Sequence, residues 1–392
     1  MYLHEYQAKE ILSRYAIAVP EGRVADTVGD AEAIARDIPA KKFAVKAQVL
    51  AGGRGKAGGV ALVATSRAVR EAAKDMLGKV LVTDQTGPEG CTVRRVYVEA
   101  GVEIERSLFI AAMIDPRTGQ VVLVGSRQGG EDIEDQAARD PTIMETLVIG
   151  PAETGPASDF AGLAERLDIG EDLRDGAAEF FEKLYGAFTE LDASLIEINP
   201  LAITSGKQFV AVDAKIVLDD NALVRHPELA ALRDTDDLDP IEMEAQRHDI
   251  NFMRMDGDIG VAVNGAGLAL ATNDMLADAG GRPANFMDIR TSATSTQISH
   301  GFDMIFKTPG VKAVLVNVHG GGMTPCDTIA EGLGMSMQRT GRKLPIVVRV
   351  AGNNADFARV VLNNCGISFY DAADIGEAVD RVVAIAGGKA AP

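Results

Sequence analysis

The stretch FAVKAQVLAGGRGKAGGVALVA at residues 43–64 decides how the first half of the chain folds. It predicts an apolar strand over residues 43–49, a glycine-rich loop, and a second strand over residues 60–64. Such loops bind phosphate in several folds, so the known patterns can be tested against this one. A P-loop is excluded, because GxxxxGK[ST] would need glycine at Leu50 and serine or threonine at Ala57.

The dinucleotide pattern GxGxxG is matched by Gly53, Gly55 and Gly58. That pattern needs a helix after the loop to receive the pyrophosphate, whereas a strand follows here, so the match is accidental. Two interpretations remain: an ordinary mobile loop, or a hairpin loop whose backbone N–H groups, Arg54 and Lys56 cover phosphates.

Lys46 favours the phosphate-binding interpretation. A lysine inside an apolar strand is costly to bury unless an anionic group pairs with it. The alternative is a charge on an edge strand, where the side chain reaches water.

A β-hairpin with its turn centred on Gly206 is the second informative feature. A symmetric register pairs Asn199 with Asp213, and Glu197 with Lys215, while the strand alternation puts Glu197 and Asn199 on one face. Carboxylate and amide oxygens beside substrate phosphates are typical of Mg²⁺ sites in nucleotide-binding proteins. A solvated polar sheet face is the alternative.

The chain changes character near a charged stretch at residues 234–249, which we interpret as a connection between two domains at residues 1–237 and 238–392. Beyond it, apolar strands alternate with helical patterns, which predicts an α/β domain with a doubly wound parallel sheet. Ligands in that architecture bind at the carboxyl ends of strands. The strands are expected at residues 259–263, 285–289, 313–318, 346–350 and 367–370; in the first half, helices are expected at residues 30–38, 66–78 and 160–192 and near the N-terminus.

Composition narrows the class of protein. The 392 residues carry 57 acidic against 39 basic side chains, a formal net charge of -18, which argues against general affinity for nucleic acid or anionic membranes. Hydrophobic residues make up 46%, so the chain can bury substantial cores. No uncharged apolar run reaches the roughly 18 residues needed to cross a bilayer. The first residues lack the pattern of a secretory signal peptide. The three cysteines are too few and too scattered for a disulfide framework. A cytoplasmic protein is expected.

Several motifs together resemble the β subunit of ADP-forming succinate–CoA ligase, in the order and spacing of that family. They are LHEYQAKEIL at residues 3–12, VKAQV at 45–49 with the glycine loop, LIEINP at 195–200, VDAK at 212–215, DDNA at 219–222 and VNGAG at 263–267. The resemblance covers nearly the whole chain. It implies an ATP-grasp region over residues 1–237 and a flavodoxin-like CoA-ligase domain over residues 238–392.

The resemblance also assigns roles to residues. It implies nucleotide contacts at Lys46, Gly53, Arg54, Gly55, Glu99, Val102 and Ser107, Mg²⁺ ligands at Asn199 and Asp213, and acid-binding positions at Asn264, Gly321, Gly322 and Met323. Glu197 matches the carboxylate that orients a phosphohistidine at the nucleotide site. The implied reaction is ATP (or GTP) + acid + CoA = ADP (or GDP) + phosphate + acyl-CoA.

In the family, the phosphohistidine and the CoA site belong to a separate α subunit. The histidines of this chain do not lie in the phosphohistidine context, so the resemblance implies an α-subunit partner in an αβ or α₂β₂ assembly. His319, before Gly320, could be a second phosphate carrier; the blander interpretation is a loop residue at a position where the family often has an aromatic side chain.

Three departures from the family pattern concern the acid and the nucleotide. Arg290-Thr-Ser-Ala293 replaces three glycines and an alanine, the segment from Gly320 to Asp327 is one residue longer and lacks an arginine, and Ser107 stands where a glutamate is common. The added cation and hydroxyls predict that Arg290 helps to bind an acid more polar than succinate, such as a hydroxy-dicarboxylate (a malate–CoA ligase-like activity), a tricarboxylate or a sulfonated carboxylate. Succinate itself, a self-contained carboxylate–amine ligase and a non-catalytic nucleotide or acyl-CoA sensor are the alternatives.

Overall fold

The computed structural model describes the chain except for residues 131, 151–158, 235–238, 322, 342 and 389–392. It divides into two compact units, Met1–Asp237 and Leu238–Pro392. No helix among the described residues is both long enough and apolar enough to cross a membrane.

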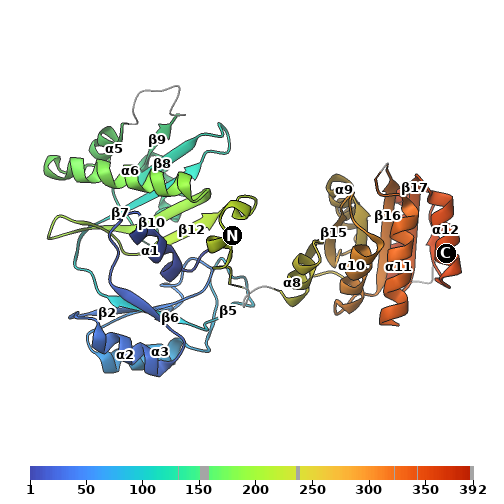
Figure 1. Ribbon diagram of the computed structural model, residues 1–392, viewed down its shortest axis with the longest axis horizontal. Helices are drawn as coiled ribbons and strands as arrows, with labels where there is room; N and C mark the ends of the chain where they lie inside the picture. The colour runs from blue at the N-terminus through green and yellow to red at the C-terminus, as the bar shows by residue number, and fades with distance from the viewer. Residues whose placement is uncertain (131, 151–158, 235–238, 322, 342, 389–392) are drawn as a thin grey trace. The chain divides into compact units, whose positions relative to one another are not determined.

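The first sheet of unit 1 has the order β1-β6-β2-β3, and all of its pairings are antiparallel. Its strands are β1 (Gly22–Ala25), β2 (Phe43–Ala47), β3 (Val60–Val63) and β6 (Val96–Ala100), and its helices are α2 (Val28–Asp37) and α3 (Ser66–Met76). Both helices lie on one face (Figure 1), where Phe43, Val45 and Ala47 join their core. Lys46 therefore points to the opposite face. The edge-strand interpretation of Lys46 is wrong, because β2 is hydrogen-bonded on both sides.

The second sheet of unit 1 has the order β11-β10-β7-β8-β9, with β12 also paired to β10. Its strands are β7 (Ile104–Ile114), β8 (Val121–Ser126), β9 (Met144–Ile149), β10 (Ala193–Thr204), β11 (Phe209–Ala211) and β12 (Ala214–Leu218), and its helices are α1 (Glu5–Arg14), α5 (Phe160–Arg166) and α6 (Arg174–Glu190). These helices share one apolar core with the sheet. The helix expected over residues 160–192 is thus two helices, separated by a 3₁₀ turn at Glu171–Leu173.

Shorter elements complete unit 1. They are β4 (Val80–Leu81), β5 (Cys91–Thr92), α4 (Ile133–Arg139), α7 (Pro227–Ala230) and 3₁₀ turns at Pro141–Ile143 and Leu223–Arg225. The N-termini of α2 and α3 are capped by the hydroxyls of Thr27 and Thr65, which accept the Asp30 and Ala68 N–H groups.

The hairpin register predicted around Gly206 is confirmed. Glu197 lies opposite Lys215, and the Asn199 N–H group donates to the Asp213 carbonyl at 3.2 Å. Ile196 and Ile198 face the apolar core on the other side of the sheet, as the alternation required.

Unit 2 is built on a sheet of order β13-β15-β14-β16-β17-β18. Apart from the antiparallel edge strand β13, its strands are parallel, and their order along the chain is the 2-1-3-4-5 of flavodoxin-like folds. The strands are β13 (Asn251–Arg254), β14 (Ile259–Asn264), β15 (Asn285–Ile289), β16 (Ala313–Gly320), β17 (Ile346–Gly352) and β18 (Tyr370–Asp371).

Helices cover both faces of this sheet. One core contains α10 (Ser295–Lys307), α11 (Cys326–Thr340) and α12 (Ala355–Asn364), and the other contains α9 (Ala266–Asp278) and α13 (Ile375–Ala386). The charged stretch interpreted as a connection also contains α8 (Pro240–Arg247), whose start is capped by the Asp239 carboxylate. Proline at the first helical position is compatible with a helix start, which the connection hypothesis overlooked.

Candidate functional site

Lys46 lies at the centre of a buried network of charges on the face of β2 that points away from α2 and α3. Its ammonium group donates to Glu5 Oε1 at 2.7 Å and to the Val212 carbonyl at 2.8 Å, and it lies 2.8 Å from Glu99 Oε1. The side chain is only 6% exposed. The anionic partner that the sequence required for this lysine is therefore present, supplied by two glutamates from α1 and β6.

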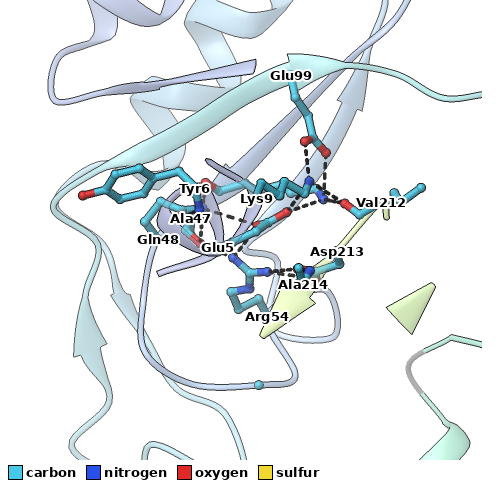
Figure 2. A network of polar contacts seen from close by, with 12 residues as sticks. Glu5, Tyr6, Lys9, Ala47, Gln48, Arg54, Glu99, Val212, Asp213 and Ala214 are labelled. Atoms are coloured by element: carbon cyan, nitrogen blue, oxygen red, sulfur yellow. Dashed lines mark hydrogen bonds and ion pairs between the residues drawn. The ribbon is translucent and has the colours of Figure 1, made fainter. Parts of the chain in front are cut away.

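Lys9 of α1 closes the network from the other side. Its ammonium group lies 2.8 Å from Glu5 Oε1 and 2.5 Å from Glu99 Oε2, and it also donates to the Val212 carbonyl (Figure 2). Glu5, Lys9 and Glu99 are almost completely buried. The N-terminal helix, the first sheet and the hairpin of the second sheet thus meet at one group of charges.

Arg54 connects the glycine loop to the same network. Its guanidinium donates to both carboxylate oxygens of Asp213, at 3.0 and 2.9 Å, lies 2.9 Å from Glu5 Oε2, and donates to the Ala47 carbonyl at 3.0 Å (Figure 2). Gly53 has a φ of 74°, which glycine adopts at little energetic cost because it lacks a Cβ atom. This backbone conformation turns the loop back toward the hairpin. The glycine loop and the hairpin around Gly206 therefore meet through Arg54 and Asp213.

The charges in this network stabilise one another. Burial opposes ionisation of Glu5, yet Lys46, Lys9 and Arg54 outweigh it and hold the pKa of that carboxyl well below its usual value. Burial likewise opposes the charge on Lys46, but Glu5, Glu99 and Asp213 raise its pKa, and Asp213 and Glu5 raise that of Arg54. All three groups are ionised at neutral pH.

Asn199 and Asp213 offer the oxygen ligands that Mg²⁺ prefers, an amide and a carboxylate side by side on paired backbone. The Asn199 amide pairs with the backbone of Gly130, accepting its N–H at 2.7 Å and donating to its carbonyl at 3.1 Å. The described residues contain no cluster of three His, Cys, Asp or Glu side chains suited to a metal. The donor set fits a metal that takes its remaining ligands from phosphates and water.

The other expected nucleotide positions are placed by strand pairing and by surface contacts. Ser107 pairs in register with Ala202 on β10, and Val102 is the second residue after the end of β6. Lys56, at the far side of the glycine loop, pairs with Asp132 at 2.6 Å on the surface. Glu197 is half-buried on the face of β10 that also carries Asn199.

In unit 2, Asn264 ties together the ends of the two strands at which the strand order reverses. Its amide donates to the His319 carbonyl at 2.7 Å and accepts the His319 N–H at 2.8 Å, which joins the end of β14 to that of β16. The next residue, Gly265, donates its N–H to Asp288 Oδ1 at 2.8 Å. This is the position where doubly wound sheets bind ligands.

The contacts of Arg290 differ from those of Asn264. Its guanidinium pairs with Asp249, and both residues line a cavity of about 50 Å³ with Ser292 and Gln297. The Thr324 hydroxyl donates to the Thr291 carbonyl at 2.6 Å, which connects the loops after β15 and β16. Gly321 and the exposed Met323 belong to the second of these loops; Gly322 lies outside the described residues.

Three charged residues were not predicted from the sequence. Glu5 and Lys9 are spaced i, i+4 on the buried face of α1. Two charges on the apolar side of a helix could have indicated a buried ion pair. Arg349 lies opposite Asn317 in the centre of the parallel sheet, its Nη1 is 3.5 Å from Asn317 Oδ1, and its buried Nε has no partner among the described residues. Its signal was a cation inside an otherwise apolar strand.

Comparison with known proteins gives two family matches, an ATP-grasp domain over residues 2–203 and a CoA-ligase domain over residues 262–383. The β subunit of ADP-forming succinate–CoA ligase from Geobacillus kaustophilus is 43% identical over 383 residues, 98% of this chain and 99% of that protein. The corresponding subunit from Burkholderia multivorans is 42% identical over 389 residues, 99% and 100% of the two chains. The chain belongs to the succinate–CoA ligase β-subunit family. Members of this family are acid–thiol ligases, so the predicted family, fold and enzyme class are confirmed.

The succinate–CoA ligase fold extends to more distant proteins. ATP citrate lyase from Methanothrix soehngenii, solved with citrate and coenzyme A, superposes with a TM-score of 0.78 at 18% identity, covering 99% of both chains. At that identity the likeness concerns the fold, an ATP-grasp domain followed by a CoA-ligase domain.

Proposed function

We propose that the chain is the β subunit of an acid–CoA ligase that catalyses ATP + acid + CoA = ADP + phosphate + acyl-CoA. The observation that carries the proposal is the convergence of Lys46 and Arg54 with Asp213 in the ATP-grasp domain. Two permanent cations beside oxygen ligands are the groups that phosphoryl transfer needs, because its catalysis rests on positioning and on neutralising phosphate charge.

Different residues would bind different parts of Mg·ATP. Lys46 and Arg54 would contact the phosphates, while the glycine loop covers them with its backbone N–H groups. Asn199 and Asp213 would hold Mg²⁺, which supplies neutralisation of the phosphate charge when bound. Glu197, on the same face of β10 as Asn199, would orient the histidine that receives the phosphoryl group.

That histidine and the CoA site would belong to an α subunit, in an αβ or α₂β₂ assembly. The relatives' designation as a β subunit supports such a partner. Three of the chain's own histidines, His4, His226 and His248, are engaged with carboxylates at 2.7, 2.7 and 3.0 Å. A carboxylate partner is compatible with a structural role for each.

The acid would carry a polar or anionic group beyond those of succinate. Arg290, Ser292 and the incompletely partnered Arg349 supply two cations and a hydroxyl in unit 2. A guanidinium binds a carboxylate or sulfonate through paired hydrogen bonds, which a methylene group of succinate cannot offer.

The test is reconstitution with an α-type subunit. The complex should exchange label between ADP and ATP, and should form acyl-CoA with a clear preference in kcat/KM for a hydroxylated, tricarboxylic or sulfonated acid over succinate. Absence of exchange would contradict the ligase mechanism, whereas exchange with a preference for succinate would contradict only the choice of acid.

A further inference from the structure

We propose that Glu5 is a positioning residue for phosphoryl transfer: its carboxylate fixes Lys46 and Arg54 where the phosphates of ATP bind. The inference rests on the proposed function, and it assigns to the N-terminal helix a part in the nucleotide site. Glu5 is the first residue of α1, far in sequence from β2, the glycine loop and the metal-binding hairpin.

The geometry divides the two carboxylate oxygens between two cations. Glu5 Oε1 accepts from Lys46 at 2.7 Å, and Glu5 Oε2 lies 2.9 Å from an Arg54 guanidinium nitrogen. Lys46 is held by a central strand, but Arg54 stands in a loop with glycines on both sides. Because glycines leave that backbone many conformations, the two carboxylates that Arg54 contacts, Glu5 and Asp213, define where its guanidinium lies.

The charge balance supports a functional arrangement. Three cations, Lys9, Lys46 and Arg54, face the three carboxylates of Glu5, Glu99 and Asp213. Asp213 is the most exposed of the carboxylates, at 33%, while Glu5 is 2% exposed. When phosphates and a metal arrive, Asp213 can exchange its partner, but Glu5 cannot reach water and continues to hold both cations.

If Glu5 had a purely structural role, its removal would lower stability without a specific loss of nucleotide binding. Asp303 on α10 provides the matched case: its carboxylate is 7% exposed and lies 2.6 Å from an Arg339 guanidinium nitrogen, and the Ser336 hydroxyl donates to it at 2.6 Å. Removing either charge should lower thermal stability, because Glu5 and Asp303 are both buried carboxylates that pair with cations. Only Glu5 touches residues of the proposed nucleotide site.

The experiment compares Glu5→Gln, Glu5→Asp and Asp303→Asn in the complex with the α subunit. Binding of Mg·AMP-PNP is measured by calorimetry, and KM is measured for ATP, acid and CoA. We expect Glu5→Gln to weaken AMP-PNP binding about tenfold or more, the loss typical of a charge-assisted hydrogen bond, with KM for CoA unchanged. Glu5→Asp, which keeps the charge on a shorter side chain, should recover part of that affinity. Asp303→Asn should lower the melting temperature without changing AMP-PNP binding.

AMP-PNP binding by Glu5→Gln as tight as wild type, or an equal loss for ATP, acid and CoA, would overturn the inference. If Glu5→Gln does not fold, Glu5→Asp decides by the same split between KM for ATP and KM for CoA. A wild-type complex that binds AMP-PNP but exchanges no label contradicts the proposed function alone, and the Glu5 comparison still stands on binding. A wild-type complex that does not bind AMP-PNP contradicts both.

Discussion

Arg54 Nη2 donates to both carboxylate oxygens of Asp213, at 3.0 and 2.9 Å, and this ion pair joins the glycine loop to the hairpin. In the proposed function, Asp213 binds a metal and Arg54 binds phosphate. The pair therefore occupies both carboxylate oxygens that the metal would use. A metal ion must displace Arg54, and the phosphates of ATP offer Arg54 the alternative anion.

The first prediction follows from this competition. Without nucleotide, Arg54→Gln should bind Mn²⁺, a probe for Mg²⁺, about three- to tenfold more tightly than wild type, because Asp213 loses its internal cation. The same variant should bind ATP more weakly. Free Mn²⁺ measured by electron paramagnetic resonance gives the first value and calorimetry the second.

Arg359 provides the control for this prediction. It pairs with Asp371 at 2.7 Å and with Asp356 at 3.0 Å in unit 2, whereas the hairpin belongs to unit 1. Arg359→Gln should leave Mn²⁺ binding as in wild type. Equal Mn²⁺ affinity of Arg54→Gln and wild type would show that the ion pair does not compete with the metal.

The second prediction concerns stability in acid. The pKa of Glu5 is held below its usual value against the effect of burial, chiefly by Lys46, Lys9 and Arg54, whereas an unfolded glutamate titrates near about 4.3. A lowered folded-state pKa contributes stability that is complete above the unfolded pKa and is lost as pH falls toward the folded pKa. The wild-type advantage over Glu5→Gln should therefore be constant near neutral pH and shrink below about pH 4.

Urea titrations at several pH values measure this difference, with unfolding followed by hydrogen exchange in the peptide that carries Glu5. At neutral pH, wild type should be more stable than Glu5→Gln by about 3 kcal/mol, the usual cost of removing one partner from a buried ion pair. A difference that stays the same down to about pH 3 would mean that Glu5 binds the same number of protons in the folded and unfolded states, so that folding does not lower its pKa.

The sequence predicted the parts of this site that follow local rules. The turn at Gly206 and the alternation along β10 were sufficient for the pairing of Glu197 with Lys215, because a two-residue side-chain period allows one register for a given turn. Lys46 predicted a buried anion for a similar reason, because burying a charge inside an apolar strand costs free energy unless an opposite charge pairs with it.

The identity of that anion did not follow from local rules. Glu5 reaches Lys46 across 41 residues, and the choice among several carboxylates depends on how α1 packs against two sheets. The edge strand β13 was missed for a related reason, since its four residues NFMR carry three exposed side chains and little apolar pattern. Short or partner-dependent features are fixed by tertiary packing.

The third prediction concerns the acid. Arg290 is half-exposed and pairs with Asp249, so an anionic substituent of the acid would compete with that carboxylate. Arg290→Ala should lower kcat/KM for the preferred acid about tenfold relative to succinate, because it removes a guanidinium–anion pair. Asp249→Asn should change the ratio in the opposite direction. Steady-state kinetics of the reconstituted complex with both acids measures these ratios.

Arg254 is the matched control for Arg290. It is similarly exposed, at 43%, and pairs with Asp239 at 2.8 Å on the edge strand. Arg254→Ala should leave the ratio between the two acids unchanged. If Arg290→Ala also leaves it unchanged, Arg290 does not select the acid, and Arg349 becomes the cation to test.

The fourth prediction separates the two interpretations of His319. Its backbone is held on both sides by the Asn264 amide, and its imidazole is exposed at the end of β16. A phosphate carrier must move between two sites, whereas a residue paired through its N–H and carbonyl to a neighbouring strand is held in place. We therefore expect the phosphoryl group on the α subunit and none on His319.

Brief exposure of the complex to labelled ATP, followed by phosphopeptide mapping, tests this directly. His319→Phe, which restores the aromatic side chain frequent in the family, should be labelled as fast as wild type. Asn264→Ala should also be labelled at the wild-type rate but should form less acyl-CoA, because the bridge between β14 and β16 supports the acid site and not the nucleotide site. Label on the peptide containing His319, or loss of labelling in His319→Phe, would make this histidine a phosphate carrier.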